Sequence, residues 1–95
     1  MEYQIVRPPL HENFELPERR ELLSLKANDL VKIIFQVADE IPERMWVILK
    51  NNDNDSLWSG ILDNDPVGVK TQEKLKAGME VKFHPLDVIQ TQSSK

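Results

Sequence analysis

The side chains best suited to chemistry in this chain are two histidines and the carboxylates near them. His11 has Glu12 and Glu15 close by, so a surface metal site is conceivable, but a solvated histidine in an irregular segment is the better explanation. His84 has Asp87 within reach as an orienting group. No nucleophile accompanies the pair, as a catalytic constellation would require. We therefore expect no catalytic residues.

Acidic and amide residues also gather in two loops, which begin at Asn51 and at Asp63. A calcium loop needs oxygen ligands at its first, third and fifth positions and a glutamate at about its twelfth position. Counted from Asn51, that last position is Leu62. Counted from Asp63, it is Lys74. Asn and Asp favour turns by themselves, so we expect neither a metal nor a cofactor.

The motifs of common enzyme classes are missing. The chain has no glycine-rich phosphate loop, no Gly-x-Ser-x-Gly and no His-Glu-x-x-His, and it contains 3 glycines in all. Asp63 and Asp65 are close in sequence, but nothing indicates the enclosed cleft that paired catalytic carboxylates require. An enzyme is the weakest of the functions considered.

The tryptophans are the best candidates for recognition. Trp46 and Trp58 lie in strands on either side of one loop, so they could be neighbours across a hairpin. Arg44 shares the face of Trp46 at a spacing of two, and Trp and Arg are enriched at binding hot spots. The competing interpretation places both tryptophans in the core. The candidate partner-binding residues are Arg44, Trp46, Trp58, Asp53, Asp55, Asp63 and Asp65.

Most of the elements that must position these residues are short strands. Alternating apolar residues and turn signals predict strands over 30–38, 45–49, 56–62, 67–70, 80–84 and 86–90. A short helix is predicted over 16–25, with Pro17 at its first position, and a helical turn over 71–76. The fold class is therefore α+β, mainly β. We expect a small, strongly bent antiparallel sheet or an SH3-like, partly open barrel with one short N-terminal helix.

One internal similarity is visible. Residues 25–33 align without gaps on residues 75–83, and Asn28 falls opposite Gly78. Both residue types tolerate a left-handed backbone, so we expect the same turn to precede a strand twice. An internal duplication and two independent uses of this turn are both open, and the second is favoured.

Length and charge limit the remaining possibilities. The 95 residues predict a single domain over 1–90 and a disordered tail over 91–95. The chain has no cysteine, no run of apolar residues long enough to span a membrane, and an acidic N-terminus without the apolar part of a secretory signal. We expect a cytoplasmic protein. Its net charge is −4 and its basic residues are scattered, which disfavours nucleic acid as a partner.

Four segments carry a resemblance to a known family. They are Leu-Lys-Ala-Asn-Asp-Leu-Val-Lys-Ile-Ile-Phe, Glu-Arg-Met-Trp-Val, Gly-Ile-Leu-Asp-Asn-Asp-Pro and Leu-Lys-Ala-Gly-Met-Glu-Val-Lys-Phe. Together they resemble an uncharacterised bacterial family known as a domain of unknown function, over about Glu15 to Ile89. The resemblance implies a small cytoplasmic domain without established catalysis and a role as an immunity or accessory protein. Asn28 departs from the glycine common in that pattern.

These observations give three expectations for function. The first is a non-catalytic protein-interaction module, an immunity-type or regulatory binder whose partner is a protein, basic in charge, or a second copy of the chain. The alternative is a small nucleic-acid-binding barrel that uses Lys32, Lys82 and Arg44. An enzyme comes last.

Overall fold

The structure is a computed structural model, and it describes residues 3–8 and 16–93. Its elements are β1 (Gln4–Ile5), α1 (Arg19–Leu23), β2 (Leu30–Gln36), β3 (Glu43–Asn51), β4 (Trp58–Leu62), α2 (Val69–Lys74), β5 (Glu80–Phe83), the 3-10 helix η1 (Pro85–Asp87) and β6 (Gln90–Gln92). His11, Glu12 and Glu15, weighed above as a metal site, lie outside the described residues. Within the described part, no helix has the length and apolar character needed to cross a membrane.

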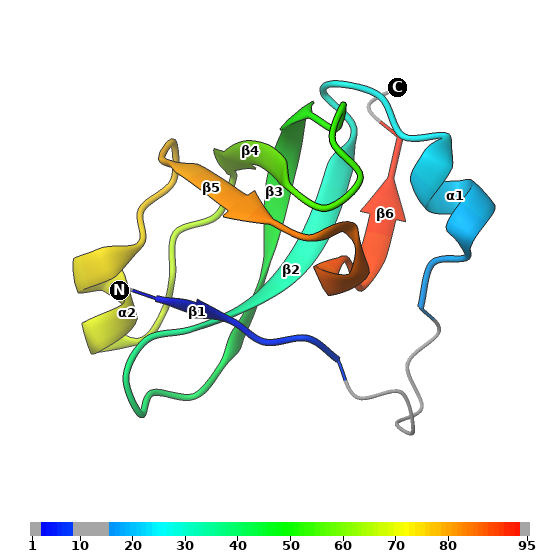
Figure 1. Cartoon of the computed structure of the whole chain (residues 1–95). Helices are drawn as coiled ribbons and strands as arrows, with labels where there is room; N and C mark the ends of the chain where they lie inside the picture. The colour runs from blue at the N-terminus through cyan, green and yellow to red at the C-terminus, as the bar shows by residue number, and fades with distance from the viewer. Residues whose placement is uncertain (1–2, 9–15, 94–95) are drawn as a thin grey trace.

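All six strands belong to one antiparallel sheet in the order β1-β2-β3-β4-β5, with β6 paired to β2. Strand β2 pairs with β3 along one edge; along the other edge it pairs first with β6, at residues 30–32, and then with β1, at residues 35–36. The sheet curls into a nearly closed barrel with α1 and α2 at opposite ends (Figure 1). The predicted mainly β fold with a partly open barrel is confirmed.

Tyr3 connects the β1 and β5 edges of the sheet, which do not pair with each other as strands. Its ring packs edge-on against Phe35 of β2, with 5.8 Å between ring centroids. Its phenol also makes a hydrogen bond with the backbone of Lys82 in β5. Burial raises the pKa of the Tyr3 phenol, and the bond to Lys82 opposes this effect. The N-terminal strand therefore reaches β5 through a side chain rather than through a ladder.

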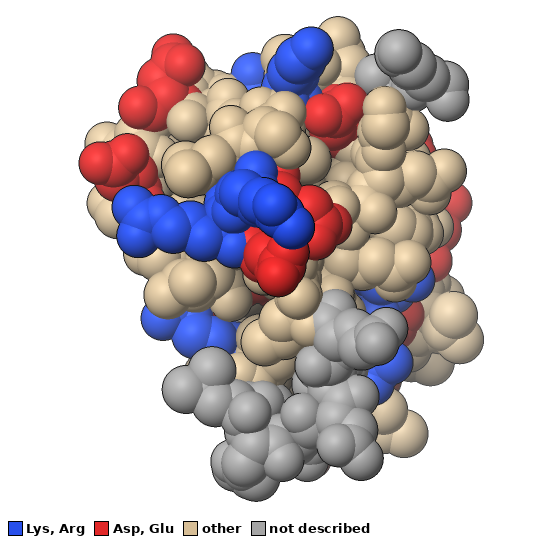
Figure 2. Space-filling model, turned by 90° about the vertical axis from the view of Figure 1, so that its right-hand side faces the viewer, with Lys and Arg blue, Asp and Glu red and all other residues tan. Residues whose placement is uncertain are grey.

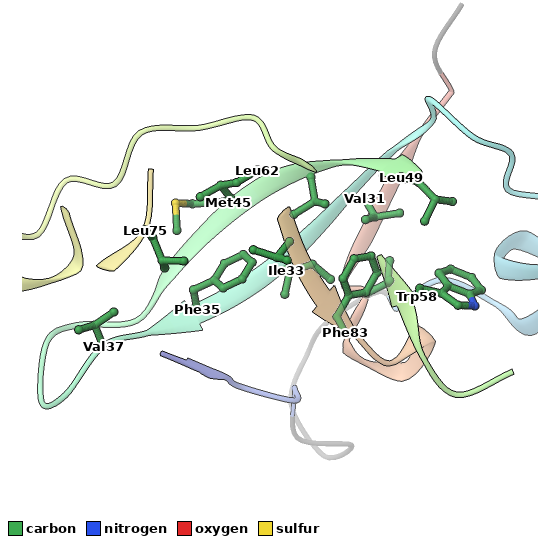
Figure 3. Close-up of a cluster of buried hydrophobic side chains, with 13 residues drawn as sticks. Val31, Ile33, Phe35, Val37, Met45, Leu49, Trp58, Leu62, Leu75 and Phe83 are labelled. Atoms are coloured by element: carbon green, nitrogen blue, oxygen red, sulfur yellow. The ribbon is translucent and has the colours of Figure 1, made fainter. Parts of the chain in front are cut away.

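The core follows the alternation of the strands. Figure 3 shows the buried cluster extending from Val37 at one end to Trp58 at the other. The cluster consists of Val31, Ile33, Phe35, Val37, Met45, Val47, Leu49, Trp58, Leu62, Leu75, Val81, Phe83 and Val88. The faces predicted for 31–37 and 45–49 are confirmed, because every second residue of these strands is buried.

The two similar turns have the same backbone geometry. Asn28 has a φ of 80° and Gly78 a φ of 96°. The amide of Asn28 donates to the carbonyl of Leu49 at 2.7 Å, and the amide of Gly78 donates to the carbonyl of Leu62 at the same distance. In both turns the next residue accepts a hydrogen bond from that same leucine. The predicted double use of one turn is confirmed.

The register of the strands extends this equivalence from the two turns to the strands β2, β3, β4 and β5. Leu30 pairs with Ile48 after the first turn, Glu80 pairs with Ile61 after the second, and Ile48 pairs with Ile61. Strands β2 and β3 are therefore related to β5 and β4 by an approximate twofold axis through the Ile48–Ile61 pair.

Two secondary-structure predictions were wrong in type. Residues 67–70 were predicted as a strand, but α2 begins at Val69. The Glu43 carboxylate accepts hydrogen bonds from the amides of Val67 and Gly68 at 2.8 and 2.9 Å, so a long-range contact sets this helix start. Residues 86–90 were also predicted as a strand. Residues 86–89 lie instead in η1 and in the link to β6, which begins at Gln90, because Pro85 occupies the first position of η1.

The ends of two other elements also differ from the prediction. The disordered tail predicted over 91–95 is wrong for 91–92, which lie in β6. Thr91 of β6 pairs with Val31 of β2, and the amide of Ile89, just before β6, donates to the carbonyl of Lys32. Backbone pairing of this kind needs no apolar side chain, which is why composition missed it. Helix α1 is shorter than the predicted 16–25, with Glu18 as its N-cap, so Pro17 precedes the helix.

Candidate functional site

The two tryptophans occupy opposite faces of the sheet. Trp58 is 5% exposed, lies edge-on to Phe83 with 6.4 Å between ring centroids, and donates from Nε1 to the carbonyl of Asn54 at 2.8 Å. Trp46 is half-buried on the other side of β3, between the core residues Met45 and Val47. The hairpin therefore does not bring the two indoles together. Trp58 belongs to the core, while Trp46 remains available for contact.

Trp46 lies on what we call the outer sheet face. This face consists of Leu30, Lys32, Ile34, Arg44, Trp46, Ile48 and Ile61, which alternate with the core residues of β2, β3 and β4; Ile34, the cross-strand partner of Arg44, is 7% exposed. Leu30, Ile48 and Ile61 pair directly and form an aliphatic row across three strands, and all three are half-buried. Neither described helix lies across these strands, as Figure 1 shows. Among the described residues, no α-helix therefore covers the apolar side chains of this part of the sheet (Figure 1).

Cations and backbone contacts surround Trp46. Lys32 is its cross-strand partner, and the Lys32 Nζ atom lies 4.6 Å from the ring centroid, a cation–π distance. The backbone amide of Trp46 donates to the Asn64 side chain, and its carbonyl accepts from the amide of Asp63 at 2.9 Å. The loop after β4 is thereby fixed beside the indole, with Asp63 next to it.

The acidic candidate residues form two separate groups. Asp63 and Asp65 follow β4 near Trp46, and the Asp65 carboxylate accepts from the amide of Ala77 at 3.3 Å. Asp53 and Asp55 lie in the β3–β4 loop, at the far end of β3. That end is about 16 Å from Trp46 at about 3.3 Å per residue. The predicted contact surface is thus divided: Arg44, Trp46 and Asp63 share one region, whereas Asp53 and Asp55 accompany Trp58.

Sequence reasoning missed a cleft at this second region. The cleft has a volume of about 450 Å³ and lies between α1, the β3–β4 loop and η1; we call it the α1–η1 cleft. It is lined by Pro17, Arg19, Leu22, Leu23, Asn52, Asn54, Asp55, Trp58, His84, Pro85 and Leu86. Leu23 is 70% exposed and Leu86 57% exposed, so apolar side chains at the cleft remain in solvent. Figure 2, which views the molecule from the α1 side, shows basic and acidic side chains intermingled on this end.

His84 has a fixed tautomer in this cleft. Its Nδ1 atom accepts a hydrogen bond from the amide of Leu86 at 2.9 Å, so the neutral ring carries its proton on Nε2. Asp87 does not orient the imidazole, because its carboxylate accepts from the His84 backbone amide at 2.8 Å and from Arg7 Nε at 3.1 Å. The considered pairing of His84 with Asp87 as a base therefore does not form.

A second group of exposed apolar residues lies at the α2 end. Ile41, Val67 and Val69 are strongly exposed. Lys70 of α2 makes an ion pair with Asp39 at 3.1 Å. The hydrogen bond from Lys70 lowers the pKa of the Asp39 carboxyl below its ordinary value. This group lacks a cleft or an aromatic residue, which makes its residues useful as controls for the two surfaces above.

No three His, Asp or Glu side chains of the described residues lie together in a way that could hold a metal ion. What the described residues offer is a partly exposed apolar sheet face beside Trp46 and a separate apolar cleft beside His84. The resemblance to a family of unknown function stays a prediction. No family model, no curated protein and no solved structure matches this chain.

Proposed function

We propose that this protein is a non-catalytic, cytoplasmic protein-interaction module, an immunity-type or regulatory binder that occludes a partner protein with its outer sheet face. The observation that supports this most directly is the partly exposed aliphatic row of Leu30, Ile48 and Ile61 beside Trp46. Soluble proteins seldom leave such contiguous apolar area uncovered unless it has a partner.

The composition of this face suits a protein partner. Fully burying one aliphatic side chain contributes about 1.5–3 kcal/mol, and the row still has part of that area to bury. An indole such as Trp46 commonly supplies a large share of binding energy at an interface. Lys32 lies over its ring, which limits the freedom of both side chains before the partner arrives. The face therefore offers apolar area with an aromatic anchor already positioned.

Charge governs the encounter with this partner. The net charge of −4 attracts a basic protein at long range, and Asp63 lies immediately beside Trp46. Complementary charge chiefly raises association rates, whereas buried aromatic contacts set residence time. The two contributions can therefore be separated by kinetics.

The identity of the face is tested by pull-down from lysate, washed at low and at high salt. Wild type serves as one bait, and a Trp46→Ala, Ile48→Ser variant shown to be folded serves as the second. A Val67→Ser, Val69→Ser variant is the matched control, because it removes exposed apolar residues from the α2 end. We expect a stoichiometric protein that is retained by wild type and by the control and lost with the second bait. Equal retention by all three baits would refute the proposed face.

The electrostatic part is tested on the captured partner. Asp63→Lys should slow association and reduce its dependence on salt, while Asp53→Lys, at the far end of β3, should change both much less. Unchanged association of the Asp63→Lys variant would remove the electrostatic part and leave the apolar contact as the mechanism.

A second candidate function is nucleic-acid binding, which the placement of Lys32 over Trp46, with Arg44 on the same face, favours. Indoles beside cations can stack single-stranded bases. Against it stands the adjacent Asp63 carboxylate. Binding of a fluorescent single-stranded oligonucleotide at low salt, lost in Trp46→Ala and weakened by added salt, would establish this function. No binding at low salt would exclude it.

A further inference from the structure

We infer that the α1–η1 cleft is a second binding site, separate from the outer sheet face, and that it takes the free C-terminal end of a peptide with an aliphatic last residue. The inference rests on an apolar cleft and on two hydrogen-bond donors in its lining, Arg19 and His84. It does not depend on the proposed function, because the cleft shares no residue with the outer sheet face.

The apolar part of the cleft can hold one aliphatic side chain. Trp58 lines the cleft, and Phe83 and the Asn54 carbonyl keep its indole in place. Leu23 and Leu86 line the same space and are largely exposed. A volume of about 450 Å³ lies within the range of small-ligand sites. A terminal residue and the peptide group before it therefore suit this volume.

The donors give the site its preference for a carboxylate. The Leu86 amide occupies Nδ1 of His84, which leaves Nε2–H as the group of the neutral ring that can bind a ligand. Neither this atom nor the Arg19 guanidinium makes a hydrogen bond or ion pair with another described residue. Arg20, the next residue of α1, is instead paired with Glu18 at 3.4 Å. Two donors without partners among residues 3–8 and 16–93, beside apolar side chains, match an anion that carries an apolar group.

The remaining charge in the lining sets the direction of the peptide. Among the described lining residues only Asp55 is acidic, and it belongs to the β3–β4 loop rather than to α1 or η1. A carboxylate is repelled by Asp55 and attracted by Arg19, so it lies toward α1 and η1. The preceding peptide amide then lies toward the loop, where Asp55 can accept a hydrogen bond.

The test is an NMR titration of the full chain with N-acetyl-leucine, which mimics such a peptide end. We expect saturable shifts at the indole N–H of Trp58 and at the backbone amides of His84 and Leu86. Uncharged N-acetyl-leucinamide should bind about tenfold more weakly or worse, because it lacks the charged acceptor. Isocaproate, which has the carboxylate and the side chain but no peptide group, should also bind more weakly.

Two variants and one control assign the donors. Arg19→Gln and His84→Asn should each weaken binding of N-acetyl-leucine about tenfold, and the asparagine can still accept from the Leu86 amide as a cap. Arg20→Gln should bind as wild type does. Equal binding of acid and amide, or equal binding by all variants, would overturn the assignment. If isocaproate binds as tightly as N-acetyl-leucine, the assignment of a peptide end as ligand is refuted and free aliphatic acids are the ligands instead. If N-acetyl-leucine causes no shift at any concentration, the binding site itself is refuted.

Discussion

Replacing Trp58 by alanine tests whether this indole supports the fold rather than a contact surface. Trp58 is 5% exposed, packs against Phe83 and donates one hydrogen bond to the Asn54 carbonyl. Truncating a buried Trp to Ala costs about 3–5 kcal/mol, and the extent of burial here places the expected loss at about 4 kcal/mol. At about 4–8 °C per kcal/mol for a domain of this size, Tm should fall by about 16–32 °C.

Trp46→Ala is the matched control, because the same residue type is removed from the other face. Trp46 is half-buried and its defined partner is Lys32, whose cation–π contact contributes about 0.5–1 kcal/mol at exposed sites. We expect a total loss of about 1–1.5 kcal/mol after part of the apolar burial is included. Trp58→Phe should fall between the two, because it keeps a ring against Phe83 and loses the bond from Nε1.

Urea denaturation followed by far-ultraviolet circular dichroism measures these losses, since each alanine variant removes one of the 2 tryptophans and alters the fluorescence signal. The midpoint and the slope are both needed, because a changed slope would show an altered denatured state. A loss for Trp46→Ala that equals or exceeds that for Trp58→Ala would refute the placement of the two indoles. A loss for Trp58→Ala below about 1.5 kcal/mol would refute it equally, because such a value is typical of a partly exposed residue.

Three further measurements test single contacts of the fold. Thr71→Val should raise stability to urea by about 1 kcal/mol, because the buried Thr71 hydroxyl has no hydrogen-bond partner among the described residues; a loss of stability would show that it has one. Tyr3, the single tyrosine, should ionise above its ordinary pKa of about 10. Its contribution to stability should therefore persist below that pH and be lost as pH rises through the pKa of the folded state. The ultraviolet absorbance of tyrosinate measures the ionisation, and ionisation at the ordinary value would contradict the prediction. Lys70→Met should raise the pKa of the Asp39 carboxyl, which the ion pair lowers in wild type. The stabilising effect of this ion pair is present above the pKa of Asp39 in the unfolded chain and is lost as pH falls through its pKa in the folded protein. An NMR titration in which the pKa of Asp39 is the same in both proteins would exclude the ion pair.

Local pattern was sufficient for the sheet and for one tryptophan. The alternation around Met45 and Val47 placed Trp46 on the outer side of its strand, and the structure agrees. Trp58 could not be placed in this way, because both faces of its strand are apolar: Leu62 shares its face, and Ile61 lies on the other. The face of β4 is decided by its register with β3 and β5, which is long-range information that one sequence does not contain.

The α1–η1 cleft and the start of α2 escaped prediction for a related reason. The cleft is built by segments near residues 20, 54 and 85, and no local pattern shows that these meet. The β-branched Val67 and Val69 suggested a strand, yet the Glu43 carboxylate binds the amides that precede α2 and favours a helix. Tertiary contacts outweighed local preference in both places.

The paired turns have a consequence for how any protein can dock on this sheet. A rotation of 180° about the Ile48–Ile61 pair superposes the backbone of β2 and β3 on that of β5 and β4. A flat partner therefore meets nearly the same backbone arrangement in two opposite orientations. Only side chains distinguish them: Lys32 faces Trp46 on one side, whereas Lys82 faces Ser59 at the equivalent place. The orientation of any docked partner therefore depends on side chains that differ between equivalent positions, namely Trp46 against Ser59 and Leu30 against Glu80.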